Sequence, residues 1–302
     1  MTEDQEIRSF VIGGTVIPAR PLEPAIYLVA TPIGNLGDIT IRALETLAAA
    51  DVVACEDTRV TRVLLERYGI RRRMIAYHEH NETEAAARLV AMVQDGKSVA
   101  LASDAGTPLV SDPGYRVVQE AIRQGVRVVP VPGASAVLSA LTVAGLPTDA
   151  FLFAGFLPTK AGQKKARLEE LARVPATLVF YESPRRTADT LALMAELLGN
   201  RHAVVARELT KTFEEVRRGT LPDLAAHYAS AGDPKGEVVL CVAPASDTVG
   251  HSEEDTDQLL LELAAEMPAA KAAGEAARMT GRKKSELYQR LLELKSNAGG
   301  EG

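Results

Sequence analysis

Short apolar runs rich in Val and Ile alternate with amphipathic segments rich in Ala and Leu from residue 25 to residue 131. Short apolar runs bounded by turn residues predict strands, and apolar residues at helical spacing predict helices. The expected strands are Ile26–Ala30, Asp51–Cys55, Met74–Tyr77, Ser98–Leu101 and Val126–Val131, and the expected helices are Ile41–Ala49, Arg59–Tyr68, Glu82–Gln94 and Tyr115–Gln124. This alternation predicts a mostly parallel sheet covered by helices on both faces.

A second group of apolar runs follows the turn at residues 145–149. The expected strands are Phe151–Gly155, Thr177–Tyr181, Ala203–Ala206, Phe213–Arg217 and Glu237–Val242. Their connections are less regular, and residues 213–217 alternate in the manner of a partly exposed antiparallel strand. We therefore predict two α/β domains, one with a parallel sheet over residues 25–148 and one with a mixed sheet over residues 149–245.

The two ends of the chain differ from these domains. Residues 1–24 are polar and interrupted by proline, which predicts a flexible arm. Residues 253–266 carry six acids and no Lys or Arg, and basic residues dominate afterwards. Ala269–Met279 and Lys284–Leu292 are expected to form two helices in a helix-turn-helix arrangement. We predict an acidic linker and a small basic helical extension over 246–302, whose charges form either a solvated face or an RNA-contacting module.

Charge and cysteine content narrow the class of protein. The 302 residues carry a net charge of −6, which argues against a uniformly basic nucleic-acid binder, although six arginines gather in Arg59–Arg73. Cys55 and Cys241 lie in apolar runs and are expected to be buried thiols of a reduced, cytoplasmic protein. No signal-peptide pattern is present, and prolines break the uncharged run Val128–Thr148, so no membrane association is expected.

The most informative segment is Leu101–Gly114, which follows a predicted strand. Pro108 lacks an amide proton and Gly106 permits a positive φ, so the chain must turn sharply at the carboxyl end of that strand. Ligands bind at this edge in open α/β sheets. A plain capped turn with Asp112 as the helix N-cap is the simpler alternative.

Two further loops of small residues, 31–38 and 132–136, follow other strands of the first domain. Neither loop has the glycine spacing of a dinucleotide or ATP site, which argues against nicotinamide, flavin or ATP as the ligand. Because no Arg or Lys clamps these loops, a neutral or zwitterionic ligand is expected.

Polar residues also follow strands of both domains, which predicts a cleft between them. Asp57 and His80 leave strands of the first domain, and Glu208 and Lys211 leave a strand of the second. A metal site at His78 and His80 is not favoured, because alternate residues of an extended segment point to opposite faces, and no metal is expected.

Nine blocks occur in order along residues 25–245: YLVATPIGNLGDIT, ACEDTR, YHEHN, SDAGTPLVSDPGYR, VPGASA, FAGFLP, FYESPRR, RELTKTFEEVRRG and KGEVVL. Together they resemble the RsmI family of ribosomal RNA small subunit methyltransferases, within the tetrapyrrole methylase superfamily. The basic tail resembles the helix-turn-helix-like extension of many members. The resemblance implies a two-domain tetrapyrrole-methylase-like α/β fold and a homodimer.

The resemblance also implies a reaction, methylation of the ribose 2′-hydroxyl of a cytidine in 16S rRNA of the small ribosomal subunit, with S-adenosylmethionine as the methyl donor. Carried over by motif, the donor-binding residues are Ile33, Ala105, Gly106, Thr107, Val110, Ser135 and Ala136, with Glu182, Leu209 and Glu237 from the second domain. The candidates for a general base are Asp57, His80, Glu208 and Lys211; a hydroxyl that loses its proton late is the alternative. The charge pattern suggests RNA contacts by Arg59, Arg62, Arg71, Arg72, Arg73, Arg282, Lys283 and Lys284.

Two other functions stay open. Small-molecule methylases of the superfamily usually carry GDP where this chain has Gly106-Thr107-Pro108, which favours an RNA substrate over a tetrapyrrole. A ribosome-associated RNA-binding protein without catalysis is the non-enzymatic alternative.

Overall fold

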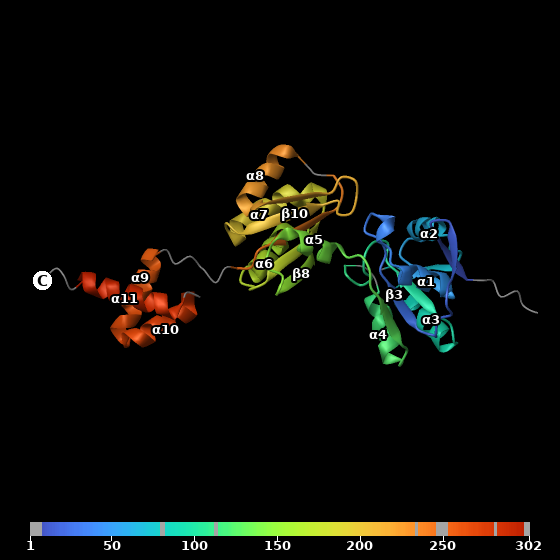
Figure 1. Ribbon diagram of the computed structural model, residues 1–302, viewed down its shortest axis with the longest axis horizontal. Coiled ribbons are helices and arrows are strands. Elements are labelled where there is room, and N and C mark those ends of the chain that lie inside the picture. The colour runs from blue at the N-terminus through green and yellow to red at the C-terminus, as the bar shows by residue number, and fades with distance from the viewer. Residues whose placement is uncertain are drawn as a thin grey trace, which may run out of the picture.

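The computed structural model describes residues 8–78, 82–111, 114–232, 235–245, 253–280 and 283–298. Figure 1 shows two α/β domains and, in red, a separate group of helices near the C-terminus. The first domain holds a five-stranded parallel sheet in the order β5-β4-β6-β3-β7. Its strands are β3 (Ile26–Val29), β4 (Val52–Cys55), β5 (Met74–Ala76), β6 (Val99–Ala102) and β7 (Val128–Val131).

Helices cover both faces of this sheet, as the alternation of elements predicts. The covering helices are α1 (Ile41–Ala49), α2 (Thr58–Arg67), α3 (Glu82–Gln94) and α4 (Tyr115–Arg123). Leu44 of α1 and Leu65 of α2 belong to one buried cluster with Val53 of β4. Leu89 of α3 and Val117 of α4 belong to the cluster on the other face. The β-branched runs are therefore buried on both sides, which is typical of a parallel sheet.

The expectation of a flexible arm is wrong for residues 8–24. Strands β1 (Ser9–Ile12) and β2 (Thr15–Pro18) form an antiparallel hairpin, and Phe10 is 1% exposed in the core beside α1 and α2. Arg8 hydrogen-bonds to the carbonyl of Ala49 and pairs with Asp51, while the Val11 amide donates to the Tyr68 carbonyl. The alternating apolar residues of this short hairpin dock on the domain despite the polar composition around them.

The second sheet is mixed, in the order β11-β10-β12-β9-β8. Its strands are β8 (Phe151–Phe156), β9 (Thr177–Glu182), β10 (His202–Arg207), β11 (Glu215–Thr220) and β12 (Val238–Val242); β8 and β9 are parallel, and the other neighbours are antiparallel. Helices α6 (Ala161–Leu171), α7 (Thr187–Leu198) and α8 (Leu221–Ala231) supply Leu168, Leu191 and Leu224 to a core on one face.

The other face of the second sheet is covered by a helix from before the expected domain boundary. Helix α5 (Ala136–Ala144) packs Val137 and Leu141 against Val204 of β10 and Val239 of β12. By packing, α5 therefore belongs to the second sheet, although a boundary at residue 148 assigns it to the first domain. The loop before α5 thus connects the two sheets directly.

Side-chain caps start three helices at the edge where β3, β4 and β7 end. Thr40 accepts from the Ala43 amide, Asp57 from the Arg59 amide, and Ser135 from the Leu138 amide. Such caps satisfy amides that have no partner within the helix. Helix α4 instead begins after Gly114 at φ +135°, so Gly114 holds the cap position that the sequence suggested for Asp112, which lies outside the described residues.

The described C-terminal residues, 253–280 and 283–298, form three helices: α9 (Glu253–Glu266), α10 (Ala269–Thr280) and α11 (Lys284–Ala298). The acidic segment was expected to be a linker, but residues 253–266 are helical, and Leu260 packs with Ala273 and Leu287 in a small core. Leu260 and Leu263 are three residues apart and lie on the packed side of this helix, whereas Glu262 and Glu266 are exposed. Among the described helices, none is long and apolar enough to cross a bilayer.

The docked hairpin makes a stability prediction. Replacing Phe10 by Ala should lower the free energy of unfolding by about 3 to 5 kcal/mol, because it removes a buried aromatic ring. The control Val16→Ala removes a side chain that is 64% exposed and should change it by less than about 0.5 kcal/mol. Urea denaturation followed by circular dichroism measures both, and equal small effects would show that the hairpin does not contribute to the core.

Candidate functional site

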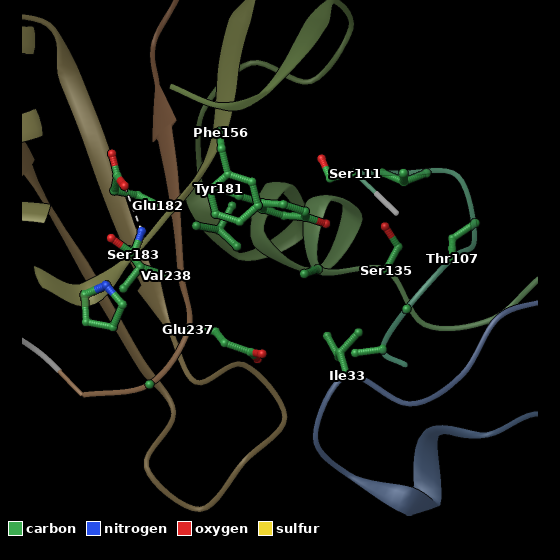
Figure 2. A pocket seen from close by; sticks show the side chains of 17 residues that line it. Ile33, Thr107, Ser111, Ser135, Phe156, Tyr181, Glu182, Ser183, Glu237 and Val238 are labelled. Atoms are coloured by element: carbon green, nitrogen blue, oxygen red, sulfur yellow. Dashed lines mark hydrogen bonds between the residues drawn. The ribbon is translucent and has the colours of Figure 1, made fainter. Parts of the chain in front are cut away.

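A cavity of about 380 Å³ lies between the two domains (Figure 2). One wall comes from the loops that follow β3, β6 and β7, and the other from the ends of β8 and β9 and the start of β12. The lining residues are Ile33, Ala105, Gly106, Thr107, Val110, Ser111, Ser135, Ala136, Phe156, Tyr181, Glu182, Ser183, Pro184, Gly236, Glu237, Val238 and Val239. Small and apolar side chains predominate, so a ligand would be recognised by backbone groups and by the shape of the cavity more than by charged side chains.

Hydrogen bonds join the three loops of the first domain to one another. Thr31 and Gly106 exchange backbone bonds of 2.9 and 3.0 Å. The Thr31 hydroxyl donates to the Ser103 carbonyl at 3.0 Å, and the Ser103 hydroxyl donates to the Gly106 carbonyl at 2.8 Å. The Thr107 hydroxyl donates to the carbonyl of Ala134 in the third loop at 3.2 Å. Hydrogen bonds between its own loops therefore hold this wall of the cavity in place without a ligand.

The central loop holds an unusual backbone conformation. Gly106 has φ +81°, and the non-glycine residues Leu109 and Ser111 have φ +71° and +64°. Such angles cost of order 1–3 kcal/mol each for ordinary side chains and gather at functional sites. A Cβ on Gly106 would lie 3.3 Å from Ile33 Cγ2, which leaves little space for a side chain at this position.

Aromatic rings and a buried glutamate shape the wall of the second domain. The Tyr181 ring stands edge-on to the Phe156 ring at 5.5 Å between centroids. Glu182 contributes backbone to the cavity, because its carboxylate turns away (Figure 2). That carboxylate accepts hydrogen bonds from the Thr190 hydroxyl at 2.7 Å and the Ser183 amide at 2.8 Å. Its role in this structure is to hold the turn after β9.

Nine of the ten residues expected to bind the donor line this cavity, and Leu209 does not. Leu209 is 7% exposed and packs in the hydrophobic cluster around α5. Sequence reasoning did not select Phe156, Tyr181, Ser183, Gly236 or Val239 as binding residues. All five fall inside three of the blocks that carry the family resemblance, FAGFLP, FYESPRR and KGEVVL, so their position in those blocks is the available signal.

Two candidate bases, Glu208 and Lys211, form one ion-pair network beside the cavity. Lys211 Nζ lies 2.8 Å from Glu208 Oε1 and 2.9 Å from Glu237 Oε2. The hydrogen bond from Lys211 and that from the Glu237 amide hold the pKa of Glu208 below its ordinary value. Partial burial works to lower the pKa of Lys211, but hydrogen bonds to Glu208 and Glu237 outweigh it and raise that pKa. At neutral pH both groups are charged and paired.

The other candidate bases lie elsewhere. The Asp57 carboxylate caps α2 and pairs with the Arg59 guanidinium at 2.6 Å, which holds the pKa of Asp57 at about 2. The Asp57 amide donates to Asp104, a carboxyl whose pKa is raised by burial and by the charge of Asp57. His80 lies outside the described residues. Asp57 is therefore a weak base, and it does not line the cavity.

The structure separates the arginines that the sequence presented as one group. Arg59 and Arg62 are exposed on the first turns of α2, at the edge of the sheet that carries the cavity, whereas Arg71 and Arg73 lie just before β5 at the opposite edge. Helix α2 between them has ten residues, about 15 Å of helix. Arg72 is half-buried and donates to the Ala48 carbonyl at the end of α1, so it has a structural contact.

In the C-terminal helices, the predicted RNA-contacting residues are only partly described. Lys283 and Lys284 are exposed at the start of α11, and Lys283 Nζ lies 3.8 Å from Glu286. Arg282 lies outside the described residues.

Comparisons with known proteins agree with this architecture. Residues 25–225 match the family model of the tetrapyrrole (corrin/porphyrin) methylases, and residues 250–295 match that of the RsmI C-terminal HTH domain. The chain is 68% identical over 294 residues to the ribosomal RNA small subunit methyltransferase I of Mesorhizobium japonicum, covering 97% of this chain and 100% of that protein. The protein of the same name from Escherichia coli O157:H7 is 45% identical over 276 residues, covering 89% of this chain and 94% of that one.

Solved structures with a similar fold are more distant in sequence. The methyltransferase CobJ has a TM-score of 0.55 at 19% identity, covering 74% of this chain and 95% of that one. A uroporphyrin-III C-methyltransferase from Thermus thermophilus, complexed with S-adenosylhomocysteine, has a TM-score of 0.51 at 21% identity, covering 72% and 97%. These likenesses show the fold, and the family follows from the closer sequences: the chain belongs to the RsmI family, the ribosomal RNA small subunit methyltransferases I.

Proposed function

We propose that this protein transfers a methyl group from S-adenosylmethionine to the ribose 2′-hydroxyl of a cytidine in 16S rRNA of the small ribosomal subunit. The observation that carries the proposal is the cavity between the domains, lined by nine of the ten residues that the family motif assigns to the donor. Membership of the rRNA methyltransferase family supports the class of reaction and of substrate.

The residues present fit this donor. A cavity of about 380 Å³ lies in the size range of small-ligand sites, and its backbone walls suit a zwitterionic molecule with a flat base. Backbone amides and carbonyls in the loops of Gly106 and Ser135 can pair with polar edges, while Ile33 and Val239 offer apolar surface. Glu237 is the one charged side chain that Figure 2 shows directed toward the opening between the walls.

The protein's contribution to the reaction is chiefly positioning. The donor supplies an activated methyl group on a sulfonium, and the chain must hold the ribose oxygen in line with that methyl. Such positioning can lower a barrier by roughly 7–11 kcal/mol. Because Asp57, Glu208 and Lys211 are each paired, a hydroxyl that loses its proton late in the transfer agrees better with the described residues than a strong base does.

The alternative of a small-molecule methylase rests on the tetrapyrrole methylases of similar fold. The helical module matched by the RsmI C-terminal HTH model, with exposed Lys283 and Lys284, favours RNA instead.

The proposal includes a cytoplasmic location and a homodimer, and light scattering tests the dimer directly. Transfer of radiolabelled methyl to 30S particles and to free 16S rRNA, followed by mapping of the labelled ribose, tests the reaction. Labelling of a tetrapyrrole and not of RNA would overturn it.

The donor loop makes a prediction at Gly106. Gly106→Val should weaken donor binding by about 100-fold or more, because the new side chain combines positive-φ strain with a clash against Ile33. Gly96→Val is the matched control, since Gly96 has φ +83° but no atom within 4 Å of its Cβ position. Calorimetry on both folded variants measures the effect. Unchanged affinity in Gly106→Val would remove the loop from the donor site.

The separated arginines make a prediction about RNA binding. Phosphate contacts release counterions, so the double change Arg59→Gln and Arg62→Gln should reduce the salt slope of RNA affinity by up to about 2 units. Arg71→Gln with Arg73→Gln removes the same charge at the opposite edge of the sheet and should reduce the slope less. Filter binding across a salt series separates the two, and equal slopes in wild type and both variants would place all four arginines away from the RNA.

The C-terminal module should serve docking. Its core contains residues of α9, α10 and α11, and the cavity is lined by residues up to Val239. Deleting residues 250–302 should therefore leave the donor Kd nearly unchanged and raise the KM for 30S particles. Calorimetry measures the donor Kd, and steady-state methylation at varied concentrations of 30S particles measures the KM. Loss of donor binding in a folded truncated protein would show that the module completes the site.

A further inference from the structure

The side chain of Lys211 crosses from the second domain onto the first loop of the other domain. A Cβ on Gly34 would lie 2.4 Å from Lys211 Cγ and 2.5 Å from Lys211 Cε. The aliphatic part of the lysine therefore lies directly on the backbone of Gly34, and a side chain at position 34 would have to displace it. Gly34 has φ +146°, a conformation that L side chains rarely adopt.

The charged end of Lys211 is held on the other side of this contact. Its ammonium bonds Glu208 Oε1 at 2.8 Å and Glu237 Oε2 at 2.9 Å, and Glu208 Oε1 also accepts from the Glu237 amide at 3.0 Å. A Cβ on Gly236 would lie 2.1 Å from the carboxyl carbon of Glu208, so a side chain at this position would have to displace that carboxylate. Three separate segments thus meet through one lysine.

The loop that carries Lys211 is itself held in a fixed shape. Glu208 and Thr210 have φ +49° and +67°, conformations that the surrounding structure must enforce. The Thr210 amide donates to the Glu214 carboxylate at 2.7 Å, and the Lys211 amide donates to the Glu208 carbonyl at 3.0 Å. A loop with these bonds presents Lys211 in one direction.

We propose that Lys211 is a positioning residue that fastens the loop at Gly34 to the second domain and thereby keeps Ile33 in place as a wall of the donor cavity. We call the contacts of Lys211 with Gly34, Glu208 and Glu237 the latch. This inference rests on the proposed function, because it assigns the cavity to the methyl donor. Ile33 is adjacent to Gly34 and packs against Gly106, so a displaced loop would open the cavity on this side.

The geometry of the ammonium excludes the role of general base that the sequence left open for Lys211. A base must offer a lone pair to the ribose hydroxyl, and a lysine bonded to two carboxylates is protonated and has none. The bonded carboxylates favour the charged form further, which agrees with the raised pKa of this side chain. Glu208 is likewise occupied by Lys211 and the Glu237 amide.

The test compares three changes at the latch. Lys211→Met keeps most of the stem and removes the charge, Lys211→Arg restores the charge, and Gly34→Ala displaces the stem while leaving the charges intact. Lys165→Met is the control, because it removes an exposed lysine on α6. Donor Kd is measured by calorimetry, and kcat at saturating donor and 30S particles is measured from pH 6 to pH 9.

The latch predicts a roughly tenfold rise in donor Kd for Lys211→Met and for Gly34→Ala, comparable to the loss of one charge-assisted hydrogen bond. Lys211→Arg should recover most of the affinity. The kcat at saturation should fall by less than about threefold, and the shape of its pH profile should not change, because the residue does not exchange a proton with substrate. Lys165→Met should match the wild type in every measurement.

Three results would overturn the latch. A collapse of kcat with unchanged donor Kd and the loss of one limb of the pH profile would make Lys211 a base, and wild-type Kd in Lys211→Met would show that the contact holds nothing. Hydrogen exchange of the donor-free protein separates this inference from the proposed function. Lys211→Met should speed exchange of amides in residues 31–38 whether or not the wild type binds S-adenosylmethionine, and unchanged exchange there would also overturn the latch.

Discussion

The pair of backbone hydrogen bonds between Thr31 and Gly106 is the constraint on which the site depends. It joins the loops after two neighbouring parallel strands, and it requires the positive φ that Gly106 adopts without cost. With these loops joined, Ala105, Gly106 and Ile33 present backbone and small side chains to one cavity. Two hydroxyls complete the arrangement: that of Thr31 donates to the Ser103 carbonyl, and that of Ser103 gives the Gly106 carbonyl a second hydrogen bond beside the one from the Thr31 amide.

The second domain completes the site by packing and by charge. Helix α5 leaves the first sheet and packs on the second, so the loop at Ser135 lies where the two domains meet. Lys211 adds a contact in the opposite direction, from the second domain to the loop at Gly34. A cavity between two sheets that are joined twice can keep its shape without a ligand, which is what catalysis by positioning requires.

The sequence allowed most elements of both sheets to be predicted, with ends that differ by a few residues, because hydrophobic periodicity and turn chemistry are local properties. It failed where a short or polar segment docks on distant residues. Phe10 lies in a polar stretch and is nonetheless buried against α1 and α2, and Leu260 lies in an acidic stretch and packs in the C-terminal core. Each of these segments has only a few apolar side chains that become buried, so the average composition of the segment does not indicate that it packs in a core.

The amino-acid sequence by itself determined the alternating α/β pattern, the loops of small residues at strand ends and nine of the ten expected donor residues that line the cavity. These follow from neighbouring residues and from ordered blocks that mark a family. Only the tertiary structure decided that Arg59 and Arg71 lie at opposite edges of the sheet, that Arg72 binds the end of α1, and that Lys211 lies across Gly34. The physical reason is that such contacts join residues far apart in the chain, and their partners depend on how helices and domains pack.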